Sequence, residues 1–207
     1  MNMKKRMLGI VLSGAMAVST AVSAGSFSAF AVAQCVAYSG SNVNDQDYVQ
    51  WSDTVKSYLT VCDNGNYMRV QSGAIKGKLL VEYYSSDFEP LSTKLIDNEL
   101  PIFGAFYDSG NNYYVLSGQE NPKQNDSLEV FRITKYDKNW NKIKSCGLYG
   151  ANTTVPFDAG SARMTHSGDH LLVRTCHEMY KSSDGNNHQA NVTIEVDMPS
   201  MTITDSY

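Results

Sequence analysis

The sequence lacks several features on which large classes of proteins depend. Beyond about the first thirty residues, no stretch sustains the periodicity of an amphipathic helix. The chain has 17 lysines and arginines against 21 acidic residues, so it offers no basic patch of the kind that nucleic acids and anionic membrane surfaces require. What remains is rich in Tyr, Ser, Asn, Thr and Val, which is typical of β-strands and their turns. We therefore expect an all-β protein with one sizeable core and no nucleic-acid partner.

Sequence motifs that would indicate a particular catalytic or binding chemistry are also missing. The sequence contains no Cys-x-x-Cys pair, phosphate-binding glycine loop, nucleophile elbow or complete calcium loop. We therefore expect neither a cofactor nor a metal. The four cysteines are Cys35, Cys62, Cys146 and Cys176. In an exported chain a Cys146–Cys176 bridge is one alternative, and buried free thiols are the other.

The amino terminus has the three-part layout of a secretory signal peptide, which we assign to residues 1–33. Three basic residues are followed by an apolar stretch from residue 7 to about 22 and then by small residues, with cleavage sites after Ala24 or Ala33. An uncleaved membrane anchor is the alternative. Loss of the three basic residues leaves 14 against 21 acidic ones, a net charge of −7. We expect a secreted or cell-surface protein without membrane contact after cleavage.

The most informative feature is a repeat of two consecutive β-hairpins, which occurs three times, at residues 56–98, 102–149 and 158–207. The first turns of the repeats carry Gly65, Gly110 and Gly168, at steps of 45 and 58 residues. Four strands at this period are typical of a β-propeller blade, although a β-sandwich is the alternative. The expected strands are 57–62, 67–75, 78–85, 91–96, 104–107, 113–119, 128–136, 142–146, 161–166, 170–180, 190–196 and 200–205.

Three such repeats do not close a ring, because propellers typically have four to eight blades. We therefore expect residues 56–207 to be an incomplete propeller from a longer chain, with self-association as the alternative. Residues 34–55 then form a linker or a closing-strand segment, of which 47–55 could pair with a last blade.

The third repeat carries the candidate site because its loops at 150–160 and 180–188 are long and polar. On one common face of a propeller such loops usually hold ligands. Candidate catalytic residues are His177, Glu178, Tyr180 and His188, and candidate ligand-binding residues are Asp158, Arg174, Asp184 and Asn191. The run His-Glu-Met-Tyr-Lys is not the His-Glu-x-x-His zinc motif, since Lys181 replaces the second histidine. His166 and His170 flank a turn at the opposite end and are expected at the surface.

Strand alternation divides the candidates between two faces. Arg174, Cys176, Glu178 and Tyr180 share one face, whereas His177 lies on the other. One interpretation is polar pairing that fixes the geometry between blades. The other is an acid–base pair of His177 with Glu178 or Tyr180, acting on a ligand in a central channel.

The run from Arg174 to Asn191, RTCHEMYKSSDGNNHQAN, lies between repeated hairpins behind a signal peptide. In this it resembles large secreted propeller-type proteins of Gram-positive bacteria, which are largely uncharacterised. The resemblance covers about residues 50–207 and implies further blades downstream. It carries no established catalytic residues.

Together these features favour an extracellular propeller scaffold that binds carbohydrate or protein ligands. The alternative is an extracellular enzyme, such as a polysaccharide lyase, a glycosidase or a group transferase, with its site on the propeller face. Fold alone does not choose between them, because propellers host both.

Overall fold

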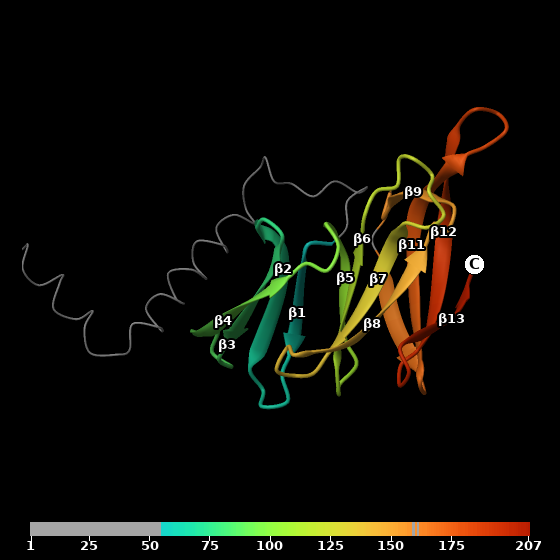
Figure 1. Ribbon diagram of the computed structural model, residues 1–207. Coiled ribbons are helices and arrows are strands. Elements are labelled where there is room, and N and C mark those ends of the chain that lie inside the picture. Colours follow the sequence, from blue (N-terminus) through green and yellow to red (C-terminus); the bar gives the residue numbers. More distant parts are fainter. Residues whose placement is uncertain (1–54, 159, 161) are drawn as a thin grey trace, which may run out of the picture.

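The computed structural model describes residues 55–158, 160 and 162–207, which form strands and turns (Figure 1). No helix in this part of the chain is long and apolar enough to cross a membrane. The predicted signal peptide, the segment 34–54 and Cys35 lie outside the described residues.

The strands form three antiparallel sheets that follow one another along the chain. The first sheet contains β1 (Ser57–Val61), β2 (Tyr67–Ile75), β3 (Lys78–Tyr84) and β4 (Pro90–Asp97). The second contains β5 (Ile102–Asp108), β6 (Tyr113–Gly118), β7 (Glu129–Tyr136) and β8 (Lys142–Tyr149). The third contains β10 (Arg163–Ser167), β11 (His170–Lys181), β12 (Asn187–Asp197) and β13 (Thr202–Ser206), and β9 (Thr153–Pro156) pairs with β11. The prediction of an all-β chain with three four-stranded antiparallel sheets is confirmed, with β9 as a fifth strand on the third sheet.

The first turn of each repeat depends on its glycine. Gly65, Gly110 and Gly168 have φ values of +80°, +89° and +57°, a region that residues with a side chain enter only at a cost in strain. In the second repeat Oδ1 of Asp108 also accepts a hydrogen bond from the backbone amide of Gly110 at 2.8 Å. Each of these turns therefore has a determinant in its own local sequence.

The turns between the third and fourth strands place a large aromatic residue in the left-handed region. Phe88 and Trp140 both have φ of 63°. The amides of the two residues donate to the carbonyls of Ser85 and Asp137, each at 3.0 Å. The two turns thus share one backbone design, although only Trp140 is buried.

The inner strands of the second sheet are largely buried, because the other two sheets stand on either side of it (Figure 1). Successive residues of β6 alternate between two cores. Tyr113 and Val115 pack with residues of the first sheet, whereas Tyr114 and Leu116 pack with residues of the third. Every residue of β6 is consequently buried.

The segment 150–160, which we expected to be a loop, contains β9. This strand adds an edge to the third sheet beside β11, and its threonines are buried. Phe157 follows it with φ of 62°, and its ring lies directly over Gly104 of β5 and Gly118 of β6. The expectation of a loop was wrong because the short apolar and β-branched run between Gly150 and Gly160 pairs with a distant strand.

Candidate functional site

His177 lies in β11 and is buried, with 5% of its surface exposed. It shares its strand face with Leu171 and Val173, which pack against the second sheet. Its Nδ1 lies 2.6 Å from Oγ1 of Thr153 in β9. Burial lowers the pKa of His177, so the imidazole is neutral at pH 7. The ring ties β9 to β11 from the inner side of the sheet.

Glu178 and Tyr180 make separate contacts. Oγ1 of Thr154 donates a hydrogen bond to Oε1 of Glu178 at 2.6 Å. The hydroxyl of Tyr180 accepts one from Nδ2 of Asn121 at 3.0 Å. Burial, and secondly the neighbouring Asp126, raise the pKa of Tyr180. Because His177 and Glu178 are adjacent in one strand, their side chains leave it on opposite faces.

His188 and Asp184 are hydrogen-bonded at the exposed end of the β11–β12 hairpin, which projects beyond the other hairpins (Figure 1). Nε2 of His188 lies 2.8 Å from Oδ2 of Asp184. The pKa of Asp184 is held well below its ordinary range, first by the hydroxyl of Ser182, then by the amide of Asn186 and by His188. His188 therefore pairs within its own turn and does not approach the buried His177.

The other three candidates each contact one neighbour in or beside the third sheet. These pairs are Asp158 with Gln189 at 2.5 Å, Arg174 with Thr193 at 2.7 Å, and Asn191 with Cys176 at 3.2 Å. The structure thus distributes the eight candidates over a buried strand face, an outer sheet face and a hairpin end. Their role in function stays a prediction.

A different feature is an open groove between the three sheets. This groove, of about 290 Å³, lies where the first strands of the three sheets, β1, β5 and β10, meet. Tyr58 of β1, Phe106 and Tyr107 of β5, and Arg163 and Met164 of β10 are among the residues that line it. The groove therefore depends on all three repeats and belongs to none of them alone.

Polar groups stand at one end of this groove. The hydroxyl of Tyr107 lies 2.7 Å from Nδ1 of His166, which links β5 to β10. Asp108 follows directly, and Oδ1 of this residue lies 2.6 Å from Nζ of Lys138. The groove thus combines an aromatic wall with hydrogen-bonding groups held in place by neighbours.

Tyr58 fills the wall on the side of the first sheet. Its ring makes edge-to-face contacts with Phe103 and Phe106, each with centroids 6.0 Å apart. Burial raises the pKa of Tyr58, while the guanidinium of Arg163 and the backbone amide of Phe106 act in the opposite direction. Arg163 and Tyr58 both line the groove, so the guanidinium brings a positive charge to it.

Sequence reasoning missed this groove. None of Tyr58, Tyr107 or Arg163 was a candidate, and His166 was expected only at the surface. It is exposed as expected, yet it also contacts Tyr107. The available signal was positional: the first strands of propeller blades line the central channel, so their polar residues could have been compared across repeats.

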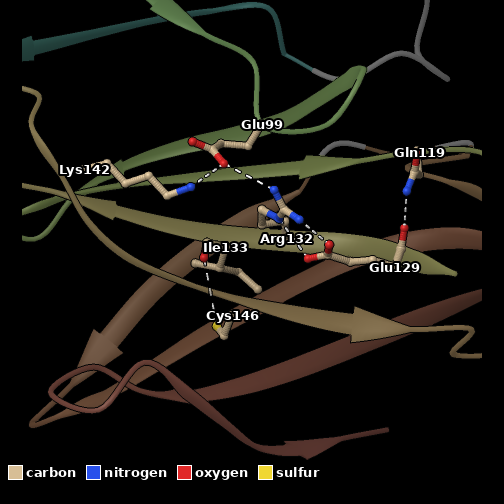
Figure 2. Close-up of polar contacts among 7 residues, drawn as sticks. All are labelled: Glu99, Gln119, Glu129, Arg132, Ile133, Lys142 and Cys146. Carbon is tan, nitrogen blue, oxygen red and sulfur yellow. Dashed lines mark hydrogen bonds and ion pairs between the residues drawn. The ribbon is translucent and has the colours of Figure 1, made fainter. Parts of the chain in front are cut away.

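Figure 2 shows a second polar cluster, between the first and second sheets. Arg132 of β7 binds both Glu129 and Glu99, with Nε 2.9 Å from Oε1 of Glu129 and Nη1 3.2 Å from Oε2 of Glu99. Nζ of Lys142 lies 2.5 Å from the same oxygen of Glu99. The pKa of Arg132 is raised, first through its hydrogen bond to Glu129. Both carboxylates are compensated by cations, so we interpret this cluster as a connection between strands.

Cys62, Cys146 and Cys176 are free thiols, so the structure has no Cys146–Cys176 bridge. In Figure 2 Cys146 faces the carbonyl of Ile133, at 4.0 Å, and burial raises its pKa to about 11. Among the described residues, no three His, Cys, Asp or Glu side chains gather in a way that could hold a metal ion.

Comparison with known proteins gives no family: no family model and no curated protein matches the chain. A solved Synechocystis apocarotenoid oxygenase variant has a TM-score of 0.47 at 11% identity, over 74% of this chain and 38% of that one. A GH43 β-1,3-galactosidase has a TM-score of 0.39 at 12% identity, over 72% and 44%. Drosophila Plexin A, in complex with Semaphorin 1b, has a TM-score of 0.34 at 10% identity, over 78% and 44%. The chain spans less than half the length of each, and likenesses this weak carry no argument about its activity.

Proposed function

We propose that the chain is part of a secreted or cell-surface β-propeller scaffold that binds carbohydrate in the groove between β1, β5 and β10. The repeats 56–98, 102–149 and 158–207 are its blades. The observation that carries the proposal is the meeting of the three first strands at one groove. This is the arrangement in which successive blades surround a central channel.

The lining of the groove suits a sugar ring. Aromatic side chains bury the apolar face of a ligand while their polar ends stay available for hydrogen bonds. Tyr107 is of this kind, and His166 and Asp108 lie next to it, whereas Tyr58 contributes its ring alone because its hydroxyl is buried. Ligand sites generally combine an apolar wall with a few fixed polar groups, and the groove has both.

The enzyme alternative has less support from the described residues. His177 and Glu178 lie on opposite faces of β11, and the imidazole is buried against Thr153. The carboxylates Glu99 and Glu129 are neutralised by Arg132 and Lys142. A binding function does not require a free acid–base pair, and we therefore prefer it.

The test is calorimetric binding of neutral and acidic oligosaccharides to the full chain. We expect Tyr107→Ala to weaken binding by about tenfold or more, because a lost ring contact and hydrogen bond together are worth more than about 1.4 kcal/mol. The matched variant is Tyr149→Ala, at an exposed tyrosine at the end of β8, which we expect to bind normally. Equal affinity of Tyr107→Ala and the unaltered chain would place the ligand elsewhere.

A further inference from the structure

The charge of the groove is not balanced. Arg163 lines it at the start of β10, and Nη1 of this residue donates a hydrogen bond of 3.0 Å to the carbonyl of Ala162. Among the described residues no carboxylate lies within ion-pairing distance of its guanidinium. A guanidinium has five N–H donors, so most of those of Arg163 stay available.

The other charged group in the lining is already compensated. Asp108 pairs with Nζ of Lys138 at 2.6 Å and also accepts a hydrogen bond from the amide of Gly110. The groove therefore carries one uncompensated positive charge, that of Arg163. The charge lies close enough to Tyr58 to act on its phenol.

We propose that this groove selects acidic carbohydrate, and that Arg163 binds the carboxylate of a hexuronate residue while Tyr107 and Tyr58 contact its ring. The inference rests on the proposed carbohydrate function and adds the chemical class of the ligand. A planar guanidinium matches a carboxylate with two parallel hydrogen bonds, which gives both strength and geometric selectivity.

The overall charge of the protein makes the inference specific. The whole chain has a net charge of −4, so long-range electrostatics disfavour acidic polymers. A preference for an acidic ligand cannot arise from a general attraction and must come from a local cation. Arg163 is exposed, so its substitution removes that cation with little effect on stability.

The experiment compares a galacturonate tetramer with its carboxyl-reduced counterpart, which differs only in the carboxylates. By calorimetry on the full chain we expect the acidic tetramer to bind about tenfold more tightly or better. Arg163→Gln should abolish this preference, so that the two tetramers bind with equal affinity. Arg163→Lys should keep part of the preference for the acidic tetramer, because the positive charge remains but the two parallel hydrogen bonds of the guanidinium are lost. Lys144→Gln removes one positive charge from exposed β8 and should keep all of it.

The outcomes separate the inference from the proposal beneath it. If neither tetramer binds, the carbohydrate function and this inference both fall. If both bind equally, the carbohydrate function stands and the selection of acids is overturned. If the acidic tetramer is preferred but Arg163→Gln keeps the preference, another cation is responsible and the assignment to Arg163 is wrong.

Discussion

The two interfaces between the sheets differ in the kinds of side chain that they bury. At the interface between the first and second sheets, the second sheet contributes an aromatic cluster of Phe106, Tyr113, Tyr136 and Trp140, which packs on aliphatic residues of the first. The interface between the second and third sheets is mainly aliphatic, and the ring of Phe157 enters it from the segment after β9. The comparison teaches that similar repeats can be joined by different packing, set by a few residues in turns and connecting segments.

Two aromatic residues in equivalent turns show the contrast most directly. Trp140 and Phe88 share the same φ, but Trp140 is 4% exposed against the first sheet, whereas Phe88 is 60% exposed and stacks only on Tyr67. We expect Trp140→Ala to lower the free energy of unfolding by about 3–5 kcal/mol. Phe88→Ala should cost about 1 kcal/mol. Both substitutions place alanine at the same positive φ, so their backbone effects are similar. The difference between their free energies of unfolding, measured by urea denaturation, therefore reports the difference in side-chain packing.

Equal losses in the two variants would mean that the turn conformation, and not the interface, determines the stability of this part of the molecule.

The second interface is tested at the contact between Gly104 and Phe157. A Cβ at position 104 would overlap the ring of Phe157, so we expect Gly104→Ala to destabilise the protein by about 1–3 kcal/mol. Phe157→Leu replaces the ring with a smaller side chain. The loss of stability in the double variant Gly104→Ala with Phe157→Leu should therefore be smaller than the sum of the losses in the two single variants. Strictly additive effects in thermal unfolding would show that the two residues do not meet.

The smallest expected effect is on the pH dependence of the free energy of unfolding. It tests His177, which shares its strand face with residues that pack against the second sheet. Burial depresses the pKa of His177 in the folded state, so the unfolded chain binds the proton more readily. This contribution to stability is complete above the unfolded value of about 6.5 and is lost as pH falls below it toward the folded pKa. We expect His177→Gln to reduce the loss of stability between pH 7.5 and 5.

An unchanged slope for His177→Gln would mean that the buried imidazole does not contribute to acid sensitivity.

Most of the strands could be predicted because their determinants are local. Alternating side chains and turn glycines such as Gly65 and Gly110 act within one hairpin, and the observed strands begin and end close to the expected residues. The alternation in β11 also assigned His177 and Glu178 to opposite faces correctly. The errors lie where a segment is defined by a distant partner, as for β9, which pairs with β11 some twenty residues later.

The residues of the groove were missed for a similar reason, because only their shared position in the first strands connects them. Tyr58, Tyr107 and Arg163 are each unremarkable in sequence, and they meet only because three sheets stand side by side. Gly104 offered a partial signal, since a glycine inside a strand often marks a close approach of another group. It did not reveal that the approaching group is Phe157.

The glycine beneath Phe157 also has a consequence for assembly. Proteins made of similar repeats risk pairing their units in the wrong order while they fold. Of the three first strands, only β5 contains a glycine, so only the second sheet offers that hollow to the ring. We therefore expect the fit of Phe157 over Gly104 to favour the correct neighbouring sheet over an otherwise similar one.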